Sequence, residues 1–341
     1  MTILVTGAAG FIGFHLCLKL ISNGYKVIGL DSLNEYYDIN LKKERLKKLY
    51  LKSKGDKNIF SFHQIKIEDK KNVNEIFDKF KPSTVVNLAA QAGVRYSLIN
   101  PASYYKSNID GFGNIIQNCV NYKVKHLVYA SSSSVYGGNE KLPLSEKDNV
   151  NHPVSLYAAT KRANELIAHS YSHLYGLPAT GLRFFTVYGP WGRPDMALFL
   201  FTKAMLNGDK IDVYNNGDMI RDFTYIDDVI KSVVKVIEKI PQYNKNIDKT
   251  NLSPEISWAP HKIFNIGNSK PIKLLEFLKV LEETLSIKAN INFLPIQSGD
   301  VVATESDTRI LEEYIGYKPK TDIKDGIAEF VKWYKKFYKI D

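Results

Sequence analysis

The chain has 341 residues, a net charge of +10, an ordinary hydrophobic content of 44%, and two cysteines, Cys17 and Cys119. This length exceeds one average domain and allows a large core, and no segment contains the roughly 20 apolar residues that a membrane span needs. Both cysteines fall in expected helices, which excludes a disulfide framework and a metal cluster. Together with a first strand that begins beside Met1, this predicts a cytoplasmic protein without a signal peptide.

The excess of positive charge is not gathered in one segment. Lysines are scattered through Lys-, Asn- and Ile-rich stretches, and no helix or strand face interleaves them with aromatic residues. This pattern argues against a nucleic-acid partner and favours the attraction of an anionic small substrate.

The first motif is a glycine-rich turn between a strand and a helix. The run Ile3-Leu4-Val5 is typical of a buried parallel strand, and a mostly apolar helix begins at Phe11. Glycines permit the tight turn and let the backbone approach a pyrophosphate, while the helix N-terminus offers free N–H groups. The turn therefore predicts a dinucleotide site, and its sequence is Thr6-Gly7-Ala8-Ala9-Gly10-Phe11-Ile12-Gly13.

The next strand, at 27–31, ends in the acidic residue Asp31. A carboxylate at this place accepts hydrogen bonds from the adenosine ribose and repels a 2′-phosphate, which favours NAD over NADP. The alternative is an aspartate that only closes a turn at the end of the strand.

Strands and helices then alternate, which predicts an α/β fold with a Rossmann-type doubly wound parallel sheet. The expected elements are a basic surface helix at 41–54, strands at 60–67 and 85–90, a helix at 103–122 carrying Asn108, and a strand at 126–130. Four serines, at 131–134, follow the last of these strands, at the edge where open α/β sheets bind ligands. A serine-rich turn is the alternative there.

Tyr157 and Lys161 form the next candidate pair. A spacing of four on a helix places both side chains on one face. An ammonium beside a phenol favours the phenolate and lowers the tyrosine pKa, as does a nicotinamide cation nearby. We therefore expect Tyr157 to act as a general base and acid.

With these residues in place, the chain resembles the extended short-chain dehydrogenase/reductase family over nearly its whole length. Within that family it is most similar to the bacterial UDP-glucuronate 4-epimerases. The motifs that carry the resemblance are Asn34-Glu35-Tyr36-Tyr37-Asp38, Ala89-Ala90-Gln91-Ala92-Gly93-Val94-Arg95-Tyr96-Ser97, the helix from Tyr157 to His173, and Arg183-Phe184-Phe185-Thr186-Val187-Tyr188-Gly189-Pro190-Trp191-Gly192-Arg193-Pro194-Asp195-Met196.

The resemblance implies a role for each matching residue. The implied catalytic residues are Ser132, Tyr157 and Lys161. The implied NAD-binding residues are Gly7, Gly10, Phe11, Ile12, Gly13, Asp31, Asn34, Ile67, Ala89, Ala90, Asn108, Tyr157 and Lys161. The implied UDP-sugar-binding residues are Arg95, Ser133, Ser134, Thr186, Arg193, Arg221 and Asp300. One departure is Lys66, at a place where relatives often have an aspartate against the adenine amine.

The resemblance also implies an architecture. An NAD-binding domain would comprise residues 1–185 and take back about 222–262. A smaller C-terminal α/β substrate lobe would lie within 186–341, mainly at 186–221 and 263–341. Helices at 103–122 and 154–175 would pair across a two-fold axis in a homodimer, although helices of a monomer's core would show the same apolar stripes.

The implied reaction is NAD-dependent 4-epimerisation of UDP-glucuronate to UDP-galacturonate through a 4-keto intermediate, a step of nucleotide-sugar metabolism and polysaccharide biosynthesis. Ser133 and Ser134 stand where the family's 4,6-dehydratases carry an Asp–Glu pair and its UDP-glucuronate decarboxylases a glutamate at the second place, so both activities are disfavoured. The remaining alternatives are a 4-epimerase of UDP-glucose or UDP-N-acetylglucosamine and a non-enzymatic NAD-sensing protein.

The expected 4-keto sugar has a further consequence for the site. A 4-keto glucuronate is a β-keto acid, which loses carbon dioxide when the bond to its carboxylate stands perpendicular to the ketone plane. An epimerase must therefore hold the carboxylate out of that geometry. The hydroxyls of Ser133, Ser134 and Thr186 and the guanidinium of Arg193 are the candidates. Alternatively, Arg193 binds a phosphate or only holds its loop.

Overall fold

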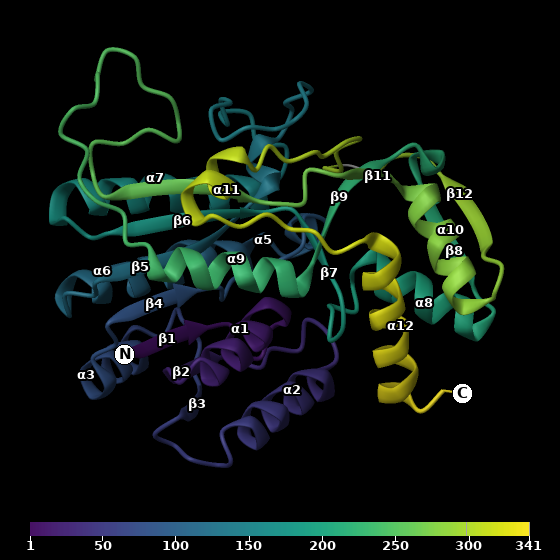
Figure 1. The fold of residues 1–341 in the computed structure, drawn as a ribbon, viewed down its shortest axis with the longest axis horizontal. Helices are drawn as coiled ribbons and strands as arrows, with labels where there is room; N and C mark the ends of the chain where they lie inside the picture. The colour runs from purple at the N-terminus through teal and green to yellow at the C-terminus, as the bar shows by residue number, and fades with distance from the viewer. Residues whose placement is uncertain (298, 341) are drawn as a thin grey trace.

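The centre of the computed structural model, which describes residues 1–297 and 299–340, is a seven-stranded sheet in the order β10-β6-β5-β4-β1-β2-β3 (Figure 1). Every neighbouring pair in it is parallel. Its strands are β1 (Thr2–Thr6), β2 (Lys26–Asp31), β3 (Phe60–Gln64), β4 (Thr84–Asn87), β5 (His126–Ser132), β6 (Ala179–Phe184) and β10 (His261–Ile266). The predicted Rossmann-type sheet is confirmed.

Helices cover both faces of this sheet, because its central strands are buried on both sides. One core joins the sheet to α1 (Phe11–Ser22), α2 (Ile39–Lys52), α9 (Ile226–Glu238) and α11 (Arg309–Ile315). The core on the other face joins it to α3 (Lys70–Phe80), α6 (Phe112–Asn121) and α7 (Leu156–Tyr175). This two-faced covering is the doubly wound arrangement that the alternation predicts.

A smaller lobe lies beside the carboxyl edge of the sheet, on the right of Figure 1. It has a three-stranded sheet, β11-β9-β7, and a parallel pair, β12-β8. Its elements are β7 (Thr186–Tyr188), α8 (Ala197–Asn207), β8 (Lys210–Tyr214), η3 (Asn215–Gly217), β9 (Ile220–Tyr225), β11 (Pro271–Lys273), α10 (Leu274–Leu285), β12 (Asn290–Leu294) and α12 (Ile323–Tyr338). Phe223, Phe277 and Phe330 lie in its own hydrophobic core.

The helix expected at 103–122 is interrupted in the structure. It consists of α5 (Pro101–Tyr104), a π-helical segment η1 (Tyr105–Gly111) and α6, and is preceded by α4 (Tyr96–Ile99). A π-helical segment shifts the direction of the side chains that follow, which period counting does not anticipate, and such segments are frequent at functional sites. The strands expected at 60–67 and 85–90 end earlier, at Gln64 and Asn87, because the chain then leaves the sheet to line a cavity.

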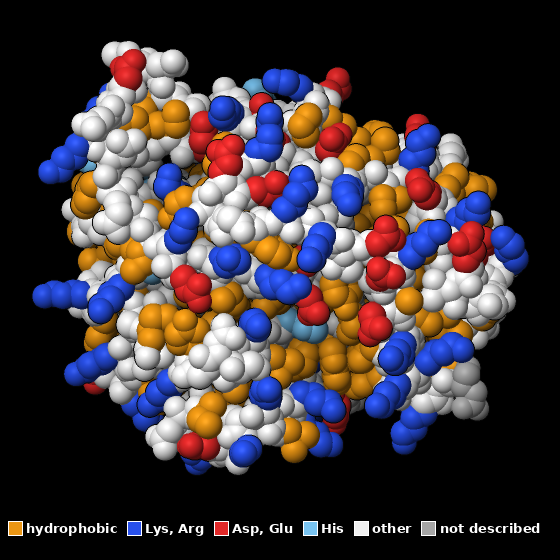
Figure 2. Space-filling model, viewed as in Figure 1, with side chains coloured by type: hydrophobic (Ala, Val, Ile, Leu, Met, Phe, Trp, Pro, Cys, Tyr) orange, Lys and Arg blue, Asp and Glu red, His pale blue; other side chains and the backbone are white. Residues whose placement is uncertain are grey.

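Lysine and arginine side chains are distributed over the whole face shown in Figure 2, among acidic and apolar ones. Within residues 1–297 and 299–340 no helix is long and apolar enough to cross a membrane. The same residues contain no group of three or more His, Cys, Asp or Glu side chains suited to a metal ion.

Candidate active site

A cavity of about 890 Å³ lies between the sheet's carboxyl edge and the smaller lobe. Its walls come from the residues that follow β1, β2, β4 and β5, and from β8 and β9 of the smaller lobe. β1 lies between β2 and β4, so the chain's direction of winding reverses there. Open α/β sheets bind their ligands at such a switch point.

The glycine turn is shaped so that only glycine fits at two of its positions. Gly7 has φ +71°, and a Cβ on it would lie 2.9 Å from the amide nitrogen of Ala89. A Cβ on Gly13 would lie 2.0 Å from the carbonyl oxygen of Gly7. The start of α1 is therefore held against the turn, and its first residues line the cavity, where the free N–H groups of a helix N-terminus suit a pyrophosphate.

Asp31 closes the turn at the end of β2, which was the alternative interpretation of this residue, and it also lines the cavity. Its Oδ2 accepts a hydrogen bond from the N–H of Ala9 at 3.1 Å and its Oδ1 from that of Leu33 at 2.9 Å. Carboxylate oxygens have further lone pairs, so the ribose contact remains open to it. These glycines and Asp31 together fit a dinucleotide.

Ser132, Tyr157 and Lys161 line the same cavity. Ser132 ends β5, while Tyr157 and Lys161 come from the first turns of α7, whose N-cap Ser155 accepts from the N–H of Ala158 at 3.1 Å. The Lys161 ammonium donates to the carbonyl of Ala130 at 3.0 Å and lies 5.9 Å from the centre of the Tyr157 ring. α7 thus aligns both side chains with the end of β5.

The pKa values of these groups follow burial more than charge. Burial raises the pKa of Tyr157, and this outweighs its hydrogen bond with Ser132 and the nearby guanidinium of Arg193. Burial also lowers the pKa of Lys161 to about 8. The pKa of Tyr157 is thus raised and not lowered as expected from Lys161, because desolvation disfavours the phenolate more than Ser132 and Arg193 favour it. The lowering expected from a nicotinamide cation stays a prediction.

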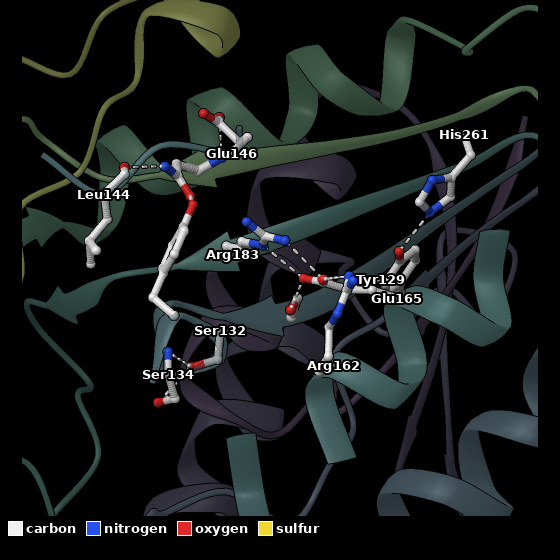
Figure 3. Close-up of polar contacts among 12 residues, drawn as sticks. Tyr129, Ser132, Ser134, Leu144, Glu146, Arg162, Glu165, Arg183 and His261 are labelled. Atoms are coloured by element: carbon white, nitrogen blue, oxygen red, sulfur yellow. Dashed lines mark hydrogen bonds and ion pairs between the residues drawn. The ribbon is translucent and has the colours of Figure 1, made fainter. Parts of the chain in front are cut away.

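Sequence reasoning missed a buried ion-pair network around Glu165 and Arg183, which Figure 3 shows together with Ser132. Glu165 of α7 accepts from Nε and Nη2 of Arg183 at 2.9 and 3.0 Å, from Arg162 at 2.9 Å, and from the hydroxyl of Ser131 at 2.6 Å. Ser131 directly precedes Ser132, so the network joins α7, β5 and β6 next to Ser132 in the chain. An arginine inside a fully buried strand was the available signal.

Two charged pairs line the cavity, and the first of them joins a loop of the large sheet to the chain after β12. Arg95 donates to Asp300 at 2.8 Å. Arg193 holds Asp195 through Nε to Oδ1 at 3.0 Å and through Nη2 to Oδ2 at 2.5 Å. Arg221, near the first pair, donates to the carbonyl of Val302 at 2.9 Å. Asp195 was not among the predicted site residues.

The structure brings nearly all the predicted site residues to this one cavity. Those that line it are Gly7, Gly10, Phe11, Ile12, Gly13, Asp31, Asn34, Ile67, Ala89, Ala90, Arg95, Ser132, Ser133, Ser134, Tyr157, Lys161, Thr186, Arg193, Arg221 and Asp300. Near Ile67, Ile65 and Glu68 also line the cavity, whereas Lys66 is exposed and is not part of the lining.

Asn108 is placed differently, behind the cavity wall. Its side chain accepts from the backbone N–H of Gln91 at 2.8 Å and donates to the Gln91 carbonyl at 3.1 Å and to the hydroxyl of Thr160 at 3.1 Å. It lies in the π-helical segment and braces the loop that lines the cavity, so the structure gives it a supporting position and no contact with the cavity.

Known proteins resemble this chain over its full length. Residues 3–252 match the NAD dependent epimerase/dehydratase family. Protein CapI of Staphylococcus aureus is 51% identical, covering 99% of this chain and all of its own, and the probable UDP-glucuronate 4-epimerase of Rhizobium meliloti is 43% identical, covering 99% and 98%. The crystal structure of Bacillus cereus UDP-glucuronic acid 4-epimerase with UDP-glucuronic acid and NAD is 32% identical, covering 99% and 100%, with a TM-score of 0.87.

Proposed function

Because this chain belongs to the NAD dependent epimerase/dehydratase family, we propose that it is an NAD-dependent 4-epimerase that interconverts UDP-glucuronate and UDP-galacturonate. One observation carries this proposal: a single cavity joins the glycine turn, Ser132, Tyr157 and the arginine Arg193. The curated relatives named UDP-glucuronate 4-epimerase and the Bacillus cereus enzyme, crystallised with this nucleotide sugar, support the choice of substrate.

The glycine turn, the start of α1 and Asp31 would bind NAD, together with Asn34, Ile67, Ala89 and Ala90. When bound, NAD would supply the acceptor, and then the donor, of the hydride that leaves and returns to C4 of the sugar. Tyr157, with Ser132 as a relay, takes the proton of the 4-hydroxyl and gives it back. Lys161, fixed on the Ala130 carbonyl, keeps a positive charge beside the phenol. The 4-keto sugar turns within the cavity between the two hydride transfers.

Preference for NAD follows from Asp31. We expect NAD to stay bound through purification and added NADP not to replace it. Asp31→Ser should narrow this preference, because the repulsion of a 2′-phosphate is lost with the carboxylate. The measurement is the dissociation constant of each cofactor for the stripped protein. Equal binding of both cofactors by the unaltered protein would contradict the assignment.

The smaller lobe's side of the cavity would hold the UDP-sugar. We assign Arg95, Arg221 and Asp300 to the UDP part, and Ser133, Ser134, Thr186 and Arg193 to the sugar carboxylate. All of them line the cavity. Ser133 and Ser134 carry hydroxyls only, so they cannot transfer the second proton that the family's dehydratases and decarboxylases need.

We also propose that the chain folds into two parts. We divide it into an NAD-binding domain of residues 1–185, which takes back about 222–262, and a substrate lobe mainly of 186–221 and 263–341. The observed α9 and β10 support the return of the chain, since both pack with the large sheet. β10 carries this return as far as Ile266, while β9 up to Tyr225 still belongs to the lobe's sheet. α11 (Arg309–Ile315) packs on the large sheet once more, so this segment falls outside the proposed lobe.

We further propose a homodimer formed through the helices at 103–122 and 154–175. These helices and the short helix α4 before them expose large apolar side chains. Burying such side chains stabilises an interface. They are Leu98, Ile99, Tyr105, Leu166 and Leu174.

We place the protein in the cytoplasm because Cys17 and Cys119 are both unpaired thiols, as a reducing compartment allows.

Incubation of the NAD-loaded protein with UDP-glucuronate, UDP-glucose and UDP-N-acetylglucosamine tests the proposed function. We expect conversion of UDP-glucuronate to UDP-galacturonate far faster than conversion of the other two, with little carbon dioxide released. Chromatographic separation of the products gives the answer. Faster conversion of an uncharged sugar, or a decarboxylated main product, would overturn the assignment.

A further inference from the structure

The pairing of Arg193 with Asp195 is built into a short turn. The N–H of Met196 donates to the carbonyl of Arg193 at 3.2 Å, and Pro194 occupies the second position of the turn, where its fixed φ is favoured. The turn brings the two flanking side chains together, and both line the cavity. The guanidinium is therefore held in one plane by its own chain segment.

Asp195 uses only one edge of that guanidinium. Arginine has five N–H donors, and Asp195 takes the side-on edge, formed by Nε and Nη2. Across residues 1–297 and 299–340, Nη1 donates no hydrogen bond to the protein. The end-on edge thus keeps donors for a planar, negatively charged ligand in the cavity.

Tyr36, from the loop that follows β2, holds Asp195 through a second contact. Its hydroxyl donates to Oδ2 of Asp195 at 3.1 Å, and its ring packs against Tyr96 with centroids 4.9 Å apart. Gly93 leaves room for this hydroxyl, because a Cβ there would lie 2.4 Å from it. Asp195 is thus anchored both by its own turn and by loops of the large sheet.

The charge state of Asp195 suits this arrangement. Burial opposes its ionisation, but the guanidinium of Arg193 and the hydrogen bonds from Arg193 and Tyr36 outweigh burial and hold the pKa of Asp195 below its ordinary value. The side-on ion pair is therefore intact at neutral pH, and Arg193 is oriented before any ligand arrives.

We propose that Asp195 and Tyr36 are positioning residues that present the end-on edge of Arg193 to the carboxylate of the nucleotide sugar. This inference rests on the proposed function, which assigns Arg193 to that carboxylate. A guanidinium oriented in advance loses less conformational freedom on binding, so the pair favours a uronate over a sugar with a hydroxymethyl group.

The same pair also opposes a side reaction of the 4-keto sugar. If the sugar ring adopts a conformation in which the bond from C5 to the carboxylate carbon stands perpendicular to the ketone plane, that bond breaks, carbon dioxide leaves, and the resulting enolate takes a proton at C5. A carboxylate held in one place by Arg193 keeps the C5–carboxylate bond out of this perpendicular geometry. Loosening Arg193 should therefore raise the share of decarboxylated product.

The test measures binding by calorimetry on NAD-loaded protein, so it does not depend on turnover. Asp195→Asn should weaken UDP-glucuronate binding by about tenfold and Tyr36→Phe by roughly threefold, as expected for a charged and a neutral hydrogen-bonding partner. UDP-glucose binding should not change in either variant. Arg193→His shows how much affinity for UDP-glucuronate is lost when the carboxylate contact itself is absent.

Asp307→Asn is the matched control. Asp307 holds Arg309 in the same side-on geometry, also two residues apart, with hydrogen bonds of 2.9 and 2.6 Å, and neither residue lines the cavity. This variant should leave the ratio of the two dissociation constants unchanged. The NAD content of every variant reports whether the large domain has folded.

Two results would overturn the inference. If Asp195→Asn and Tyr36→Phe bind UDP-glucuronate as tightly as the unaltered protein, the two residues do not position Arg193. If Asp195→Asn binds it more tightly, Asp195 competes with the ligand for Arg193. Either result can occur in a protein that epimerises UDP-glucuronate normally, so it is distinct from a failure of the proposed function, which the panel of UDP-sugars detects.

Discussion

Replacing Tyr157 by phenylalanine is expected to slow epimerisation by about 10²–10⁴-fold, because it removes the hydroxyl assigned to proton transfer. The ring itself keeps its packing, edge-on to Tyr104 with centroids 6.2 Å apart, so the cavity wall should be preserved. Product formation is measured by separating the UDP-sugars, and bound NAD by absorbance. Ser132→Ala should slow epimerisation less than Tyr157→Phe does, since a water can partly replace the Ser132 hydroxyl in the relay.

Tyr104→Phe is the matched control for this prediction. The Tyr104 hydroxyl donates to the carbonyls of Ala92, at 2.9 Å, and of Gly93, and so it braces their loop and is not assigned to proton transfer. Its loss should lower stability by about 1 kcal/mol without a hundredfold loss of rate. Near-full epimerisation by Tyr157→Phe with NAD bound would show that another group transfers the proton.

Replacing Glu165 by leucine is expected to destabilise the folded protein by about 3–5 kcal/mol, because Arg183 is left buried without its carboxylate partner. Both side chains of this pair are fully buried. The free energy of unfolding in urea measures the effect. The double variant Glu165→Leu/Arg183→Met should recover much of the loss, since an apolar pair of similar volume carries no desolvation penalty.

Glu44→Gln serves as the control for an ion pair in water. Glu44 lies 3.6 Å from Lys47 and both side chains are exposed, so its removal should have no measurable effect on stability. If the double variant were as unstable as Glu165→Leu alone, the unpaired charge would not explain the loss. The hydroxyl of Ser131, which donates to the same carboxylate, would then be the next partner to remove.

The features that the sequence predicted correctly are those that depend on neighbouring residues. The strand, the glycine turn and the helix within residues 3–22 follow from local steric limits and from the spacing of apolar residues. Alternating βα units are enough to predict a doubly wound parallel sheet. The helical spacing of Tyr157 and Lys161 likewise predicts that both lie on one face, and both reach the same cavity. Each of these properties depends on residues that lie a few positions apart in the chain.

Other features were decided only by the tertiary structure. Tyr36 and Asp195 are 159 residues apart in the chain, and Arg95 and Asp300 are 205 apart, so no local rule pairs them. The pKa of Tyr157 moved opposite to the expectation from Lys161, because burial depends on every segment packed around the phenol. Hydrogen-bond partners and desolvation are properties of atoms gathered from distant parts of the chain, whereas turns and helical faces depend on residues a few positions apart.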